Sequence, residues 1–244
     1  MAEFLHAGVN RVSMGLQSLD DKILKFLGRE HTVSEALSAL EIVRQNFTNV
    51  SLDLIYATIS ETPASWKSQL MQVLDLDIPH LSLYQLVVER GTAFYTRQRN
   101  GERLNLNDDH AADLYELTQK LTNEAGFEAY EISNHTKSSM ECQHNLNYWR
   151  AGDWIGIGPG AHGRFCIKSN HYADLRRIGT ETRHSPIGWL ESVKKKGHGI
   201  SVQTTDYAND YATEIMMMGL RLIEGVKIDC IESLCGPKDR WLNK

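Results

Sequence analysis

A single acidic residue interrupts an apolar segment and is the first candidate for chemistry. Asp53 stands in SLDLIYA, on the same side of an expected strand as Ile55. An ionised carboxylate is costly to bury without partners, so Asp53 needs a hydrogen-bond donor or a cavity. A satisfied structural acid and a ligand-binding acid both fit this pattern. Gln17 and Arg29 each follow directly after an expected element, where α/β sheets and barrels gather their site residues.

A second group of chemically capable residues lies in CQHNLNYWRAGDWIGIGPGAHG, residues 142–163. Cys142 and His144 offer soft or borderline donors that suit a metal ion or a heme iron. The alternative is a histidine hydrogen-bonded in a polar corner, with Tyr148 and Trp149 as packing residues. Residue types alone leave both interpretations open.

The glycines of the same stretch match G-x-G-x-x-G at Gly158, Gly160 and Gly163. Pro159 occupies the turn and no helical pattern follows, so the context argues against a dinucleotide-binding loop. We expect instead a close approach of this backbone to a ligand or to another backbone segment. His162, inside the turn, fits either a ligand-binding or a structural role.

Bulk properties narrow the classes of function. The chain has 244 residues, 41% hydrophobic and 23% charged, which is typical of a globular protein. A net charge of −5 provides no basic field, so no nucleic-acid partner is expected. No apolar run approaches the roughly 20 residues that span a bilayer, and no signal peptide is recognisable, which predicts a cytoplasmic location. The four cysteines show no spacing typical of a complete zinc or iron–sulfur site.

Alternating strand and helix patterns position these residues in an α/β fold. Strands are predicted over 9–17, 50–57, 80–88 and 127–133, and helices over 20–27, 63–74 and 107–126. Thr32 and Glu35 form a capping box that opens a further helix. Strands that are apolar on both faces and separated by helices indicate βαβ units with a parallel sheet.

The pattern changes after residue 163. A hairpin around 171–177, a helix over 186–196 and a long amphipathic helix over 206–228, capped at Asp206, predict a smaller second domain. The chain opens on what resembles the last turns of a helix and stops soon after a new helix begins. We therefore expect an incomplete chain whose sheet has unpaired edges.

Several segments, in order, carry a family resemblance. GVNRVSMGLQSLDDKILKFLGREH, SLDLIYA, HLSLYQLVVERGTAFY, YEISN, HNLNYW and GIGPGAHG resemble the radical S-adenosylmethionine (SAM) family of oxygen-independent coproporphyrinogen III oxidase-like proteins. HNLNYW fits the H-N-x-x-Y-W pattern of its heme-chaperone branch. EIMMMGLRLIEGV resembles the C-terminal domain of that branch.

The resemblance implies a fold and a set of site residues. Residues 1–169 would form the later part of a partial (β/α)6 TIM-like barrel, without the early strands and the cluster loop. Residues 170–244 would form a small, mainly helical and incomplete C-terminal domain. The implied SAM contacts are Gln17, Arg29 and Asp53, with Val87 and His162 as neighbours of the SAM site. The implied heme contacts are His144 as iron ligand, with Tyr148 and Trp149 against the porphyrin.

The chain also departs from the family. Family members use a [4Fe–4S] cluster, held by a C-x-x-x-C-x-x-C motif, to cleave SAM to a 5′-deoxyadenosyl radical, and this motif is not in the sequence. We expect the chain alone not to be catalytically competent. Its implied role is heme delivery in porphyrin metabolism, with heme or porphyrin and a separate cluster-carrying N-terminal half as partners. The alternatives are a heme-binding module without radical chemistry and a non-functional remnant of a split gene.

Overall fold

The computed structural model describes residues 1–105, 107–137, 139–167 and 175–237. The chain divides into two compact units, Met1–Glu141 and Cys142–Lys244. The boundary predicted between residues 169 and 170 lies outside the described residues and stays a prediction. The α/β class expected from the sequence is confirmed, since strands and helices alternate along the first unit.

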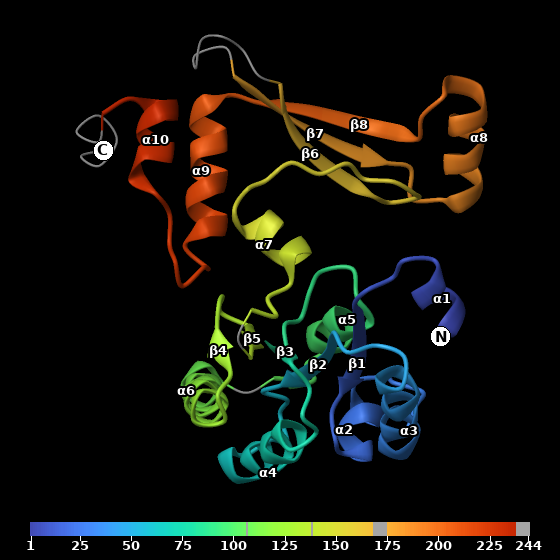
Figure 1. The fold of residues 1–244 in the computed structure, drawn as a ribbon, viewed down its shortest axis with the longest axis vertical. Coiled ribbons are helices and arrows are strands. Elements are labelled where there is room, and N and C mark those ends of the chain that lie inside the picture. Colours follow the sequence, from blue (N-terminus) through green and yellow to red (C-terminus); the bar gives the residue numbers. More distant parts are fainter. Residues whose placement is uncertain (106, 138, 168–174, 238–244) are drawn as a thin grey trace. The chain divides into compact units, whose positions relative to one another are not determined.

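The first unit is built on a five-stranded sheet with strand order β1-β2-β3-β5-β4 (Figure 1). Its strands are β1 (Val12–Gln17), β2 (Val50–Tyr56), β3 (His80–Gln85), β4 (Glu128–Ala129) and β5 (Asn134–Thr136). The first three are parallel, as predicted, whereas β5 pairs antiparallel with both β3 and β4.

The single strand predicted over 127–133 is therefore wrong. The Glu131 carboxylate accepts a hydrogen bond from the Ser133 backbone N–H at 3.0 Å and another from the Asn134 side-chain amide. These bonds stabilise a reversal of the chain between two short strands. A carboxylate that bonds the backbone two residues further on competes locally with extended structure.

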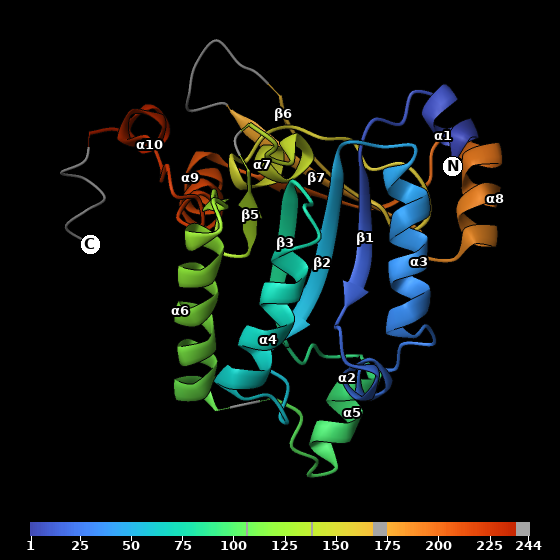
Figure 2. The ribbon, with the colours of Figure 1, turned by 60° about the horizontal axis from the view of Figure 1, so that its bottom comes forward.

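Six helices of the first unit are described: α1 (Ala2–His6), α2 (Asp21–Phe26), α3 (Val33–Arg44), α4 (Pro63–Leu74), α5 (Ala93–Arg99) and α6 (Asp108–Glu124). Both hydrogen bonds of the predicted Thr32–Glu35 capping box are present at the start of α3. Figure 2 shows that α3, α4 and α6 all lie on one face of the sheet.

The core of the first unit lies between that sheet face and these helices. Buried leucines of the strands (Leu16, Leu52, Leu54, Leu81, Leu83) pack with residues of α3, α4 and α6 such as Leu40, Trp66, Leu70 and Leu114. The Trp66 ring stacks on Tyr56 with centroids 4.8 Å apart, and its Nε1 donates to Thr118 Oγ1 at 2.8 Å. Because strand side chains alternate between faces, every residue between these leucines points to the side without helices.

The second unit combines a three-stranded antiparallel sheet with four helices among its described residues. The sheet order is β6-β7-β8, with β6 (His162–Ile167), β7 (Arg176–Thr182) and β8 (Ile200–Asp206). The helices are α7 (Gln143–Trp149), α8 (Pro186–Lys196), α9 (Ala208–Gly219) and α10 (Ile228–Cys235). The predicted hairpin around 171–177 falls largely outside the described residues.

The long helix predicted over 206–228 is corrected in two respects. Asp206 ends β8, and α9 is capped by Tyr207 and Asp210 instead. The helix ends at Gly219, and the chain beyond it returns so close that a Cβ added to Gly219 would lie 2.4 Å from Val226 Cγ2. The segment SVQTT, which lies in β8 before α9, is rich in β-branched residues and pairs with β7.

Candidate functional site

A row of polar residues crosses the helix-free face of the first sheet. The strand register places Asp53 beside Gly15 on β1 and beside Ser82 on β3, and places Ser82 beside Asn134 on β5. Ser82 Oγ donates to Asn134 Oδ1 at 2.8 Å. The three parallel strands thus present apolar side chains to α3, α4 and α6, while the opposite side carries Ser13, Asp53 and Ser82 together with the apolar Ile55.

Among the described residues, Ser13 is the side chain that donates to Asp53. Ser13 Oγ lies 2.9 Å from Asp53 Oδ1 and 3.0 Å from Oδ2. One hydroxyl carries one proton, so it satisfies one of these oxygens at a time. Asp53 is partly exposed, and its carboxylate keeps acceptor positions that a ligand can use.

Gln17 and Arg29 meet at the end of β1. Arg29 Nη2 donates to Gln17 Oε1 at 3.1 Å. The Gln17 side chain folds back over Gly15, where an added Cβ would lie only 2.5 Å from Gln17 Nε2. Gly15 in turn pairs with Asp53. The structure therefore brings together Gln17, Arg29 and Asp53, the three residues that the resemblance assigned as direct SAM contacts.

Val87 lies apart from Gln17, Arg29 and Asp53, in the wall of a separate cavity. It is 70% exposed and lines a cavity of about 290 Å³ beyond the ends of β2 and β3, together with Ala57, Gln85 and Asp108. The residues that line this cavity include none of Gln17, Arg29 and Asp53.

A buried polar group beside this row was not identified from the sequence. Ser51 Oγ lies 2.7 Å from His80 Nδ1, and His80 Nε2 lies 2.9 Å from the Tyr130 hydroxyl. Burial lowers the pKa of His80 to about 3, so the ring is neutral at pH 7. The alternation of serine and histidine with leucine in VSLDL and HLSL is the sequence signal that points to it.

The segment to which the resemblance assigns a heme contact forms α7 of the second unit. His144 and Tyr148 are four residues apart and share one side of the helix, with ring centroids 4.7 Å apart in an edge-to-face contact. Tyr148 makes a similar contact with Trp154 at 4.5 Å. His144 is exposed, and no hydrogen bond or ion pair of its ring occurs among the described residues.

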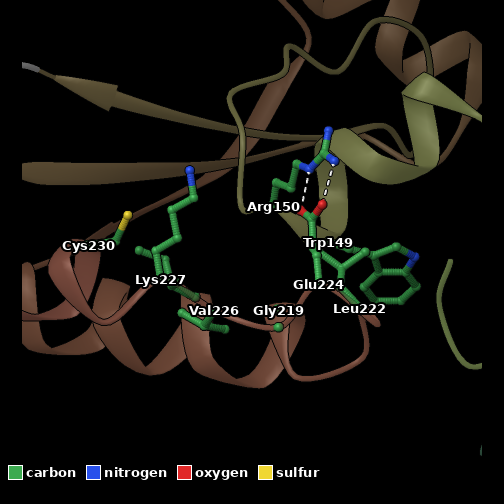
Figure 3. Close-up of a pocket in the computed structure, with 10 residues that line it drawn as sticks. Trp149, Arg150, Gly219, Leu222, Glu224, Val226, Lys227 and Cys230 are labelled. Carbon is green, nitrogen blue, oxygen red and sulfur yellow. Dashed lines mark hydrogen bonds and ion pairs between the residues drawn. The ribbon is translucent and has the colours of Figure 1, made fainter.

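Trp149 points elsewhere. Five positions separate it from His144, which is about 140° around the helix axis, and the Arg221 guanidinium lies 4.4 Å from its ring centroid. Figure 3 shows Trp149 in the wall of a cavity of about 380 Å³, next to the ion pair of Arg150 Nε with Glu224 Oε1 at 2.8 Å. The structure thus groups His144 with Tyr148 and leaves Trp149 on another side.

The glycine turn brings backbone segments together in the second unit. A Cβ on Gly163 would lie 2.6 Å from Thr180 Oγ1 and 3.0 Å from the Gly156 backbone nitrogen. Gly158 and Gly160 adopt positive φ angles, which glycine tolerates best. His162 is exposed at the first position of β6. The contact with Gly156 is of the backbone-to-backbone kind that the sequence left as one alternative.

Metal ligands do not cluster in the part of the chain that the structure describes. No group of three or more His, Cys, Asp or Glu side chains there could hold a metal ion. The described residues therefore do not fit a [4Fe–4S] cluster. No described helix has the length and apolar character needed to cross a membrane.

Three parallel strands with α3, α4 and α6 on one face and a polar row on the other, next to an antiparallel β5–β4 pair, fit part of an open (β/α) barrel. In (β/α) barrels the ligand site lies at the C-terminal ends of the strands. Residues 1–68 match the family model of the radical SAM superfamily. The solved coproporphyrinogen III oxidase of Escherichia coli, described as a radical SAM enzyme, superposes with a TM-score of 0.70 at 18% identity, covering 95% of this chain and 54% of that chain. At that identity the superposition shows the fold alone.

Two curated relatives cover nearly the whole chain. Radical S-adenosyl methionine domain-containing protein 1, mitochondrial, of Danio rerio is 35% identical over 93% of this chain and 51% of that protein. The heme chaperone HemW of Escherichia coli is 37% identical over 91% of this chain and 55% of that protein. The chain spans about half the length of these relatives. Its resemblance to the coproporphyrinogen III oxidase-like radical SAM proteins, in their heme-chaperone branch, is confirmed.

Proposed function

We propose that the chain acts in heme handling, with a SAM-binding face in its first unit and a heme contact on α7. The observation that carries the proposal is the assembly of Gln17, Arg29 and Asp53 within the region that matches the radical SAM model. Cluster ligands would come from outside the described residues, in a separate polypeptide segment. The expected cytoplasmic location stays a prediction, because the Danio rerio relative is named as mitochondrial.

The chemistry of the polar row suits SAM. Asp53 offers acceptor oxygens for the ribose hydroxyls or the ammonium group, and the Gln17 amide offers both a donor and an acceptor. Arg29 supplies a cation for the SAM carboxylate. Because Gly15 has no side chain, the Gln17 amide can lie directly over it. A Cβ at position 15 would take up that space. The residues present therefore fit the adenosyl and amino-acid groups of this cofactor.

Replacing Asp53 tests the SAM face. Asp53→Asn removes a charge-assisted hydrogen bond worth about 1.5–3 kcal/mol, so we expect the affinity for SAM to fall about tenfold or more. Isothermal titration calorimetry with SAM measures it, and Asp75→Asn, an exposed acid at the end of α4, is the matched control. Equal affinities of the wild type and Asp53→Asn would contradict the assignment.

The heme contact rests on the exposed ring of His144 beside Tyr148. An imidazole nitrogen is a common axial ligand of heme iron, and the aromatic rings of Tyr148 and Trp154 next to it suit the porphyrin plane. Trp149, on another side of α7, remains a predicted contact that needs its own variant.

A heme titration with His144→Ala tests the iron ligand. We expect a changed Soret band and an affinity lower by about tenfold or more, because the axial bond is lost. His198→Ala, an exposed histidine of the same unit, is the control and keeps the wild-type spectrum. An unchanged spectrum in His144→Ala excludes this ligand. Heme binding without SAM binding would instead support a heme-binding module without radical chemistry.

A further inference from the structure

Two residues at strand ends adopt a backbone conformation that is unusual for their type. Gln17, at the end of β1, has φ 67°, and Ala57, directly after β2, has φ 64°. The Ser18 backbone N–H donates to Leu16 C=O at 2.9 Å, so Gln17 is the central residue of a tight γ-turn with positive φ. This turn is rare and strained, and it persists only where neighbouring groups hold it.

The residues directly after Gln17 are held by a single side chain of α4. Ser18 Oγ donates to Gln69 Oε1 at 2.7 Å, and the Leu19 backbone N–H donates to the same oxygen at 3.0 Å. Gln69 is buried. Its side-chain carbonyl oxygen therefore fixes both Ser18, the last residue of the γ-turn, and Leu19, which follows it.

The other end of the Gln69 amide reaches the exit of β2. Gln69 Nε2 donates to Glu61 Oε1 at 3.5 Å, and Glu61 Oε2 accepts from the Thr58 N–H at 2.8 Å and from Thr58 Oγ1 at 3.1 Å. Thr58 directly follows Ala57. Each of these side chains is at most 7% exposed, so one buried hydrogen-bond chain joins both strand exits.

We propose that Gln69 and Glu61 are positioning residues, which hold the exits of β1 and β2 so that the Gln17 amide lies over Gly15 and beside Asp53. This inference rests on the proposed role of Gln17 in SAM binding. The alternative is a purely structural role, in which the hydrogen bonds of Gln69 attach α4 to the sheet and stabilise the fold without affecting the affinity for SAM. The two roles are separable because Gln69 bonds to Ser18 and Leu19, whereas Val73 of the same helix belongs to the hydrophobic core.

The test compares three variants of the full chain on α4. Gln69→Leu removes both the oxygen that accepts from Ser18 and Leu19 and the N–H group that donates to Glu61. Gln72→Leu makes the same chemical change at an exposed position of the helix, and Val73→Ala removes buried core volume. For each variant, calorimetry gives the affinity for SAM, thermal unfolding gives Tm, and NMR gives the Cα and Cβ chemical shifts of Gln17, which report its backbone angles.

We expect Gln69→Leu to weaken SAM binding about tenfold and to move the Gln17 shifts, because two hydrogen bonds to the turn are lost. Val73→Ala lowers Tm, yet keeps the affinity and the Gln17 shifts, and Gln72→Leu changes none of the three. If Gln69→Leu does not fold, Ser18→Ala removes one of the two bonds, and a smaller loss of affinity with moved Gln17 shifts is expected.

Two outcomes would overturn the inference. One is a folded Gln69→Leu variant with wild-type Gln17 shifts and an affinity within twofold of the wild type. The other is an equal loss of affinity in Val73→Ala, which would make the effect one of stability alone. If the wild-type chain itself does not bind SAM, the proposed function of this face fails. The positioning role is then decided by the Gln17 shifts, which move in Gln69→Leu if it is right and stay if it is wrong.

Discussion

Two buried histidines of the first unit have opposite hydrogen-bond environments. Both ring nitrogens of His80 have partners, Ser51 and Tyr130, whereas both ring nitrogens of His135 are buried with no hydrogen-bond partner among the described residues. Burial lowers the pKa of His80 to about 3 and that of His135 to about 4. Both rings are therefore neutral in the folded protein near neutral pH.

Acid is expected to weaken the first unit through these histidines. Their folded pKa values lie below the ordinary value near 6.5, so the unfolded chain takes up more protons once the pH falls below that value. Above about pH 6.5 both histidines are neutral in the folded and the unfolded chain, so they cost no stability there. As the pH falls from about 6.5 toward the folded pKa of each ring, the free energy of unfolding decreases by about 1.4 kcal/mol per pH unit for each histidine.

The variant His135→Leu isolates one of the two contributions. It removes a buried imidazole without partners, so the free energy of unfolding at pH 7 is expected to rise by about 1 kcal/mol. Urea unfolding between pH 7 and pH 4.5 should also show a shallower loss of stability than the wild type. His110→Gln, an exposed histidine of α6, is the control. A pH dependence in His135→Leu identical to that of the wild type would contradict the assignment.

Sequence reasoning reached some of these residues and missed others for a physical reason. Asp53 was recognisable because a charge in an apolar strand needs a partner, and Gln17 and Arg29 because strand and helix ends gather site residues. His80 and Gln69 were not singled out. Their roles depend on which side chains the register and the crossing of α4 bring near, and this information is not local in the sequence.

At the level of elements, β7 carries the anchor of the second unit. Arg177 is fully buried, and its Nε donates to Glu214 Oε2 of α9 at 2.9 Å. Its Nη1 lies 3.1 Å from Asp153 Oδ1, and its guanidinium lies 4.6 Å from the Tyr211 ring centroid. One side chain of the central strand thus ties the sheet to α9 and to the segment after α7.

Removing this cation is expected to be strongly destabilising. Arg177→Met removes the nearest cation of Glu214 and of Asp153. Breaking a fully buried ion pair typically costs about 3–5 kcal/mol. We expect a loss at the lower end of that range, because Glu214 keeps Arg164 at 3.9 Å and the Asp153 side chain is 52% exposed. Urea unfolding measures the loss, and hydrogen–deuterium exchange of β7 locates it in the second unit. Arg176→Met, at the neighbouring exposed position, is expected to change stability by less than about 0.5 kcal/mol. Equal effects of the two variants would contradict the anchoring role.

The elements that were predicted and those that were missed differ in the range of their interactions. The start of α3 and the whole of α4 and α8 follow from caps and apolar stripes contained in a dozen residues. β8 is exposed along most of its length, so it lacks the alternation of apolar and polar residues that marks a half-buried strand. Its pairing with β7 supplies the hydrogen bonds instead.

At the scale of the whole molecule, the α/β class and the parallel order of β1, β2 and β3 were predictable from the alternation of elements. The antiparallel β4–β5 pair was not, because a buried carboxylate turns the chain within four residues. The division into two compact units at residues 141 and 142 depends on which strands pair, and this is likewise a property of contacts between distant residues.

Because α3, α4 and α6 pack on one face of the first sheet, its two faces are under different constraints during evolution. Substitutions on the side of α3, α4 and α6 must fit a packed core, in which a lost methyl group already costs stability. Substitutions at residues 13 and 53, on the other side, lie at exposed or partly exposed positions and leave that core untouched. Ligand preference can therefore drift in a lineage while the fold is conserved, and the two faces of one sheet are expected to record different rates of substitution.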